Sequence, residues 1–150
     1  MLTAAILFSV STSASASSIS ASVESKVVVN INTETPAPKI TKSYTGIIVD
    51  CRGFGLQRAM SPVIKDERGA IIYGDKNLDE TKITNFGMAH YATDPNDISR
   101  AGNKPLRVRA IGVENFNRNP VLSLKDAEFI ILANNGANFL ENASVVFLVD

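Results

Sequence analysis

The fold of this chain is decided by one stretch, residues 44–74, which reads YTGIIVDCRGFGLQRAMSPVIKDERGAIIYG. Its first part, Thr45 to Cys51, is rich in β-branched apolar residues and predicts a buried strand. Gly53 and Gly55 follow, one on each side of Phe54. Glycine adopts a positive φ at little steric cost, so these two residues predict a sharp structural turn directly after the strand.

A β-hairpin is expected next, at about residues 62–73. Pro62 to Lys65 begins its first strand, and Ala70 to Tyr73 forms the return strand. The residues between them, Asp66 to Gly69, have the composition of a turn, with Gly69 suited to a left-handed conformation. Turn residues between two β-prone runs predict two antiparallel strands here.

The second half of the chain predicts a strand from Lys104 to Val113. Arg107 and Arg109 fall on one face of this strand. The opposite face carries three apolar residues: Leu106, Val108 and Ala110. This alternation is typical of a half-buried strand with one face toward water. The shorter segment 87–92 favours a strand or a buried turn.

Two short helices are expected before this strand. The first begins at Asp79, in a polar segment. The second is capped by Thr93 or Asp94, has Pro95 in its first turn and ends before Gly102.

The longest helix is expected at residues 123–135. Ser123 can accept a hydrogen bond from the backbone three residues later, and Asp126 suits the positive end of a helix. The apolar face is formed by four residues at helical spacing: Leu124, Ala127, Ile130 and Ile131. The sequence Asn134-Asn135-Gly136 predicts a left-handed end to the helix.

A continuous apolar run, ASVVFLV, occupies residues 143–149. A run of this length without polar alternation predicts a strand that is covered on both faces and therefore central in its sheet. The predicted class is α+β, with a small mixed β-sheet. This sheet contains the hairpin at about 62–73 and the central strand 143–149, and the helix 123–135 packs on one face.

Composition restricts the classes of function. The chain has 150 residues, of which 45% are apolar, which suits one domain with an ordinary core. Fifteen basic and fifteen acidic side chains cancel, so there is no electrostatic reason to expect a nucleic-acid partner. A neutral chain also has little colloidal repulsion, which favours self-association. The single Cys51 excludes an internal disulfide.

Residues 1–16 predict a signal peptide, since an apolar run precedes the cleavage pattern Ala14-Ser15-Ala16. The apolar run is about half the roughly 20 residues that a membrane-spanning helix needs. Residues 17–43 are expected to form a Ser/Pro-rich leader and linker, with a β-prone segment at Val27 to Ile31. Residues 44–150 are expected to form a single domain that is exported, either periplasmic or associated with the outer membrane.

Cys51 and His90 are the only thiol and the only imidazole of the chain. A thiol-dependent enzyme needs a cysteine activated by a nearby base, so this is the one candidate catalytic pair. Core packing is the more common role for isolated residues of these types, and the chain is not expected to be an enzyme. One Cys and one His cannot build the usual zinc site, so neither a metal nor a cofactor is expected.

Four charged residues are candidates for interaction: Asp50, Arg52, Arg107 and Arg109. Asp50 and Arg52 flank Cys51 and project to the same face, where they can pair with each other or with a partner. Arg107 and Arg109, together with Lys104, can bind an acidic partner, although a solvated face is the more common role of such residues.

The glycine-rich turn at residues 52–55 lacks the third glycine of a dinucleotide fingerprint. It also lacks the Lys-Ser/Thr pair of a phosphate-binding loop. We therefore expect Gly53, Gly55 and Gly69 to have structural roles in turns.

Several blocks of the chain match a family pattern in order and spacing. They are Tyr44 to Asp50, Arg52-Gly53, Gly55-Leu56, Ala59 to Pro62, Asp66 to Gly69, Tyr73-Gly74, Lys104 to Ala110 and Val145 to Asp150. This order resembles that of bacterial envelope lipoproteins, namely the twenty-kilodalton outer-membrane lipoprotein family and the related flagellar assembly lipoprotein P. The resemblance implies an exported, non-enzymatic accessory of the flagellar basal body or the outer membrane. The chain has no Cys for lipid attachment directly after the signal.

The first functional expectation is therefore a non-catalytic structural or protein-interaction module of the cell envelope. Its partner would be an envelope protein or a second copy, and peripheral membrane association is compatible with it. The alternative is a periplasmic domain that binds a small ligand or an anion through the turn 52–55 and Arg107 or Arg109. A second alternative is a thiol-dependent enzyme that uses Cys51 and His90.

Overall fold

A computed structural model describes residues 43–75 and 78–150, which belong to one compact unit. The expected signal peptide at 1–16 and the expected strand at Val27 to Ile31 lie outside the described residues. So does the leader at 17–43, apart from its last residue.

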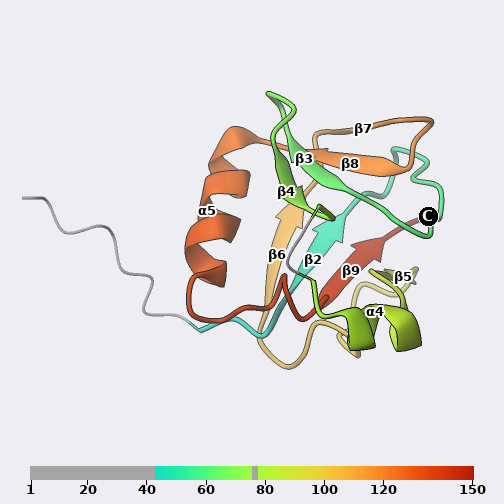
Figure 1. Ribbon diagram of the computed structural model, residues 1–150. Coiled ribbons are helices and arrows are strands. Elements are labelled where there is room, and N and C mark those ends of the chain that lie inside the picture. Colours follow the sequence, from blue (N-terminus) through green and yellow to red (C-terminus); the bar gives the residue numbers. More distant parts are fainter. Residues whose placement is uncertain (1–42, 76–77) are drawn as a thin grey trace, which may run out of the picture. The chain divides into compact units, whose positions relative to one another are not determined.

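The first of two sheets is entirely parallel, with the strand order β5-β9-β2-β6 (Figure 1). Its strands are β2 (Gly46–Asp50), β5 (His90–Ala92), β6 (Pro105–Arg109) and β9 (Val145–Leu148). β9 and four of the five residues of β2 are buried. Continuous burial suits these two strands to the centre of a parallel sheet, where both faces are covered.

The second sheet is mixed and has the order β4-β3-β8-β7. Its strands are β3 (Ile64–Asp66), β4 (Ile71–Tyr73), β7 (Gly112–Glu114) and β8 (Asn119–Leu122). β3 pairs antiparallel with β4, as the predicted hairpin requires, and parallel with β8. Asp66 fixes the hairpin turn, because its carboxylate accepts hydrogen bonds from the backbone of Arg68 and Ala70.

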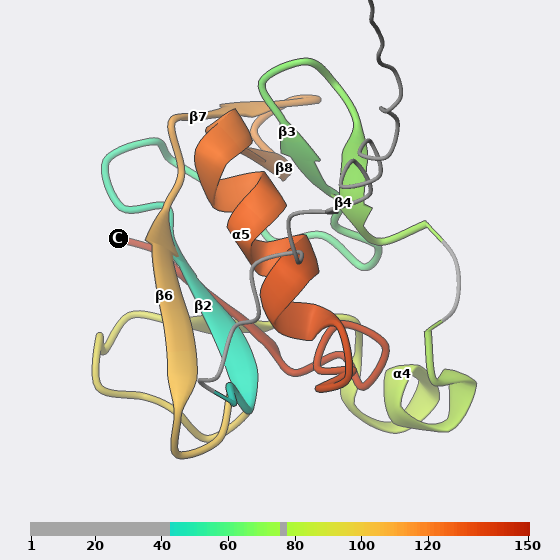
Figure 2. The same ribbon diagram turned by 90° about the vertical axis from the view of Figure 1, so that its left-hand side faces the viewer.

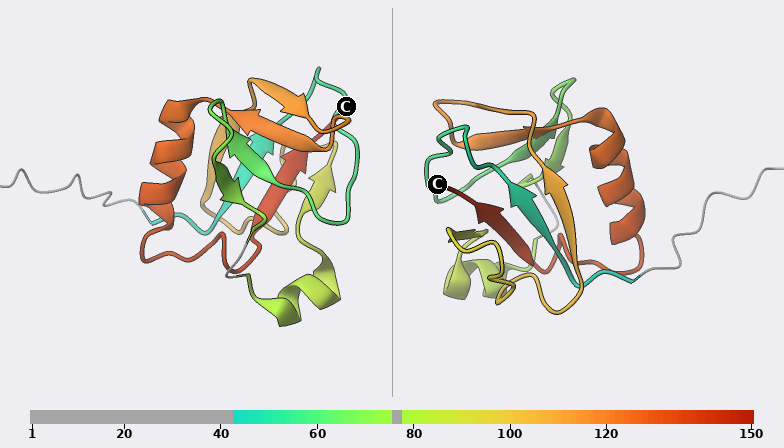
Figure 3. Two further views of the ribbon diagram at one scale, coloured as in Figure 1. Left: turned by 45° about the horizontal axis from the view of Figure 1, so that its top comes forward. Right: turned by 180° about the vertical axis from the view of Figure 1, so that it is seen from behind.

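Two helices complete the unit, α4 (Glu80–Phe86) and α5 (Leu124–Asn134). Asp79 caps the first and Ser123 caps the second, each by accepting backbone hydrogen bonds. α5 and the second sheet cover one face of the parallel sheet, and the segment 93–104 crosses the other face (Figures 2 and 3). Within the described residues, neither helix has the length and apolarity that a bilayer crossing requires.

The core has two parts, one on each face of the parallel sheet. The larger part joins the inner face of that sheet to α5 and the second sheet, and it includes Ile47, Val49, Ile64, Leu122, Ile130, Val145 and Phe147. The smaller part lies under the segment 93–104 and consists of Ile48, Ala92, Ala101, Val146 and Leu148.

These observations confirm the α+β class, the hairpin, the central position of the last strand and the helix packed on one face. The expected single sheet is divided in two, because the strand expected from Lys104 to Val113 bends after its first half. The backbone N–H of Ala110 donates to Asp50 in the first sheet, whereas that of Ile111 donates to Val121 in the second. The predicted strand is therefore two strands, β6 and β7, in different sheets.

Two further expectations were wrong. Residues 93–102 form turns and not a helix. The carboxylates of Asp94 and Asp97 accept hydrogen bonds from the backbone N–H groups of Asn96 and Ser99, and such local bonds compete with helix formation.

The second error concerns α5, where Ile131 is 53% exposed and does not belong to the core. The buried positions are Ala127, Ile130 and Ala133, so the buried stripe of this helix lies on residues spaced by three.

Candidate functional site

All four strands of the parallel sheet end at the same edge, as the arrowheads of β2, β6 and β9 show in Figure 1. In open sheets of parallel strands, ligands bind outside the carboxyl ends of the strands. Two of the four predicted interaction residues end neighbouring strands at this edge. Asp50 ends β2, Arg109 ends β6, and the two are partners in the strand register.

The carboxylate of Asp50 is held by two arginines. Arg52 binds it with both Nε and Nη2, at 2.9 and 2.7 Å, and Arg109 Nη1 lies 3.1 Å from Oδ2. The hydrogen bonds from Arg52 lower the pKa of Asp50 to about 2, and the positive charge of Arg109 acts in the same direction. The structure thus contains the expected pair of Asp50 and Arg52, with Arg109 added to it.

Arg109 is further oriented by two contacts with the glycine-rich turn. Its Nη2 donates to the backbone oxygen of Arg52 at 3.1 Å, and its guanidinium lies over the ring of Phe54 at 5.7 Å. The turn itself is fixed at Gly53, whose N–H donates to the carboxylate of Asp150. These contacts make one ordered polar cluster at the end of the sheet.

The predicted glycine turns are present. Gly53 and Gly55 have φ values of 88° and 67°, and Gly69 in the hairpin turn has a φ of 91°. These values lie in the left-handed region, which favours glycine over other residues.

The polar cluster borders an open hollow of about 330 Å³. Its lining residues are Ile48, Asp50, Arg52, Pro95, Arg107, Val108, Arg109 and Leu148. The lining contains three guanidinium groups and one carboxylate, so the hollow carries an excess of positive charge. We call these eight residues the arginine hollow.

Arg107 differs from the other two arginines of the arginine hollow. Its Nη1 donates to the backbone oxygen of Pro95 at 2.9 Å. Within the described part of the chain it has no salt bridge. Lys104 was expected to join this basic face, but it precedes β6 at the opposite end of the strand and does not line the hollow.

Cys51 is fully buried and lies in the larger core. Burial raises the pKa of its thiol to about 12, and the charge of Asp50 acts in the same direction. Its Sγ donates to the backbone oxygen of Val49 at 3.7 Å. His90 is bonded elsewhere, since its Nε2 lies 2.9 Å from Asp97. The structure does not join the thiol and the imidazole in a hydrogen bond.

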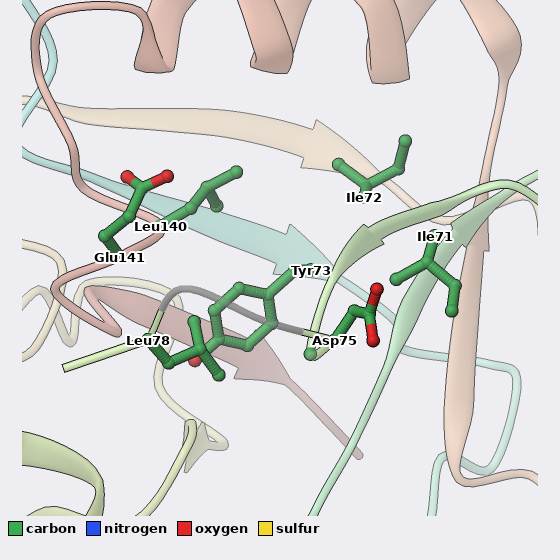
Figure 4. Close-up of a pocket in the computed structure, with 8 residues that line it drawn as sticks. Ile71, Ile72, Tyr73, Asp75, Leu78, Leu140 and Glu141 are labelled. Atoms are coloured by element: carbon green, nitrogen blue, oxygen red, sulfur yellow. The ribbon is translucent and has the colours of Figure 1, made fainter. Parts of the chain in front are cut away.

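A second hollow, of about 250 Å³, lies beside β4 (Figure 4). Its lining combines apolar side chains with two carboxylates: Ile71, Ile72, Tyr73, Gly74, Asp75, Leu78, Leu140 and Glu141. Sequence patterns did not indicate it, because its residues come from distant parts of the chain. Across residues 43–75 and 78–150, no group of three or more His, Cys, Asp or Glu side chains is arranged to hold a metal ion.

Sequence analysis also missed three residues of the polar cluster and its surroundings. Phe54 and Asp150 hold the glycine-rich turn, and Pro95 orients Arg107. Asp150 directly follows the run 143–149, which was a usable signal. The contact of Asp150 with Gly53 could be expected only once β9 was known to run parallel to β2.

Comparison with protein families gives a match over residues 46–150, which extends from the first residue of β2 to the last residue of the chain. The matching family is described as Treponema pallidum Tp0624, second domain. A comparison with curated proteins gives no match.

Proposed function

Since the chain belongs to the family of the second domain of Treponema pallidum Tp0624, we propose that it is an exported, non-catalytic interaction module of the bacterial cell envelope. A family defined by one domain of a larger protein supports a role as a module. The resemblance of residues 44–150 to envelope lipoproteins supports the cell envelope as its location, in an outer-membrane or flagellar assembly. The signal-like sequence at 1–16 supports export.

The observation that carries this proposal is the arginine hollow at the end of the parallel sheet. Asp50 orders Arg52 and Arg109 before any partner arrives, so less side-chain entropy is lost on binding. Arginine is also enriched among the residues that dominate protein–protein binding energy. An acidic group of a protein partner fits this surface because the lining carries three guanidinium groups.

The surroundings of Cys51 support the non-catalytic part of the proposal. The thiolate is the reactive form of cysteine, and a thiol with a pKa of about 12 contains almost none of it at neutral pH. The thiol is also fully buried. A substrate would therefore need to enter the core to reach it.

A photo-crosslinking experiment in producing cells tests the interaction. A photoreactive residue replaces the exposed Arg107 in the full chain, and the control carries the same residue in place of the exposed Glu67 at the hairpin tip. We expect a discrete crosslinked product from position 107 only, and its loss when Arg109→Glu is added. Equal products at both positions, or none at position 107, would refute the role of the arginine hollow.

Export has a separate test. Residues 1–43 are fused to a reporter enzyme that is active only outside the cytoplasm. We expect activity from this fusion, and loss of activity when the apolar run before Ala14 is interrupted by two aspartates. Activity that survives this change, or none in either fusion, would contradict export.

A second candidate is the binding of a small anion in the same place. The volume of about 330 Å³ lies at the lower end of the range of ligand pockets, roughly 300–1,000 Å³. Calorimetric titration with inorganic phosphate and with citrate tests it. Binding that is lost in Arg107→Ala would favour this candidate, and the absence of binding heat would eliminate it.

A further inference from the structure

Among the described strands, β6 is the outer strand of the parallel sheet, and none of them pairs with its second edge (Figure 2). The backbone N–H of Ala110, directly after β6, donates to Asp50 at the end of β2. Backbone groups of successive residues in a strand point alternately to its two sides. The N–H and C=O groups of Arg107 and Arg109 therefore point away from the sheet. Neither residue takes part in a backbone hydrogen bond between β6 and a loop of the described chain.

The same two residues carry the charge of this edge. Their side chains lie on the face of β6 that borders the arginine hollow, where Arg52 adds a third guanidinium. Only one carboxylate, that of Asp50, opposes these three groups in the lining. A strand that pairs with β6 would therefore meet two arginines, at positions two residues apart, on one of its faces.

The opposite face of β6 is apolar. Leu106 is buried in the larger core, and the half-buried Val108 packs against that core at its margin. Side chains of an added strand alternate between the two faces. Those on the face opposite to Arg107 and Arg109 would lie beside the side chain of Val108, where an apolar side chain removes surface from water.

We infer that β6 binds an extended segment of a protein partner in which acidic and apolar residues alternate. This inference rests on the proposed function and specifies the chemistry of the partner. The backbone of the segment pairs with the free N–H and C=O groups of Arg107 and Arg109, as in other cases of strand addition. Its acidic side chains oppose the two arginines at the cross-strand spacing of about 4.5–5.5 Å between Cβ atoms.

Pro105 limits where the added strand can begin. It is the first residue of β6 and has no N–H, so the edge offers its first donor at Arg107. The open edges of the second sheet lack this combination. β4 carries no charged residue, and the one charge of β7, on Glu114, is paired with Lys65.

The test uses the full chain and a short synthetic peptide of alternating Glu and Val. Amide hydrogen exchange is measured with and without the peptide. We expect exchange at the N–H groups of Arg107 and Arg109 to slow at least tenfold on saturation, with little change at Ile71 in the edge strand β4. A peptide in which Lys replaces Glu is expected not to bind.

Variants separate the backbone contribution from the charge contribution. Arg107→Ala and Arg109→Ala are each expected to weaken binding roughly fivefold, the effect of one exposed ion pair. The exposed Arg118→Ala serves as the matched control and is expected to bind as the unchanged protein does. Two further peptides carry N-methyl groups on alternate residues, one at the odd and one at the even positions, so each lacks the N–H donors on one of its edges. We expect the peptide that lacks the donors facing β6 to bind at least tenfold more weakly than the unmethylated peptide.

Several results would overturn the inference. Equal binding of the peptide and both N-methylated forms would show that the acidic groups bind without strand addition. Slowed exchange at sites other than Arg107 and Arg109, or no binding, would also refute it. If the crosslink at position 107 persists in cells while the peptide fails, only this inference falls. If the peptide adds to β6 but no crosslink forms, the proposed cellular function falls instead.

Discussion

Asp50 and Arg109 end two neighbouring parallel strands at matching register positions, and their side chains meet with 3.1 Å between Oδ2 and Nη1. Arg52 binds the same carboxylate through two of its nitrogens. One acidic group therefore orders two basic groups at the end of the sheet. Because Asp50 is only partly exposed, its contacts with the arginines are less screened by water than those of a fully exposed pair.

Replacing Asp50 by asparagine tests this order through the pH dependence of stability. The folded-state pKa of Asp50 is lowered from 3.8 to about 2, so the carboxylate stabilises the fold above pH 4, and this contribution is lost as the pH falls toward 2. We expect Asp50→Asn to lower the free energy of unfolding by roughly 1–2 kcal/mol at pH 7, after allowance for solvent screening.

Urea unfolding at several pH values between 2 and 7 measures this effect. The difference between the two proteins should shrink as the pH approaches 2. The exposed Glu67→Gln serves as the control and should leave stability unchanged at every pH. A difference that is constant from pH 7 to pH 2 would contradict the assignment to ionised Asp50.

Two glycines provide a matched test of the turn after β2. Gly53 has a φ of 88°, and a β-branched residue resists such a conformation. Gly112 in β7 has no positive φ, and no atom lies within 4 Å of the position that its Cβ would occupy. We expect Gly53→Val to lower the free energy of unfolding by about 1–3 kcal/mol and Gly112→Val to change it by less than about 0.5 kcal/mol. Thermal unfolding measures both, and an unchanged midpoint for Gly53→Val would disprove the role of this turn.

Arg100 joins the end of α4 to Ala143, which lies shortly before β9. Its guanidinium donates to the backbone oxygens of Phe86, Gly87 and Ala143. Arg100→Ala leaves these three carbonyl oxygens without the hydrogen bonds of the guanidinium. We therefore expect it to lower the free energy of unfolding by roughly 2–3 kcal/mol. Arg100→Lys should recover only part of the loss, because an ammonium group cannot reproduce the planar fork. Chemical unfolding measures both variants, and full recovery by lysine would show that charge alone suffices.

Alkylation of Cys51 distinguishes a packing role from an enzymatic one. The buried thiol has a pKa of about 12, so we expect almost no reaction of the folded protein with iodoacetamide at pH 7. The protein unfolded in urea should react completely, and Cys51→Ala should not react in either state. Mass spectrometry over time measures the reaction. Fast labelling of the folded protein, with a rate that rises near neutral pH, would instead support the thiol-dependent enzyme.

The features that sequence predicted correctly depend on contiguous residues. The hairpin turn follows from Asp66 to Gly69, and the start of α5 follows from the capping side chain of Ser123. The central position of β9 follows from its continuous apolar run. In each case the residues that decide the structure are neighbours in the chain, so their pattern is sufficient.

The features that sequence did not predict depend on distant partners. The bend between β6 and β7 arises because Ile111 bonds to Val121, which lies in a strand that comes later in the chain. The meeting of Asp50 and Arg109 depends on the parallel register of β2 and β6, which neither strand encodes alone. The arginine hollow depends in addition on Pro95, in a segment whose composition predicted a helix.

The position of β9 between β5 and β2 has a consequence for the order of events in folding. β2 and β5 cannot be joined in one sheet until residues 145–148 have been synthesised and inserted between them. Contacts between such distant residues carry a high loop-closure cost and make folding slow. Until then β5 has no partner among the described strands of this sheet, and removal of β9 would separate β5 from the rest of the sheet.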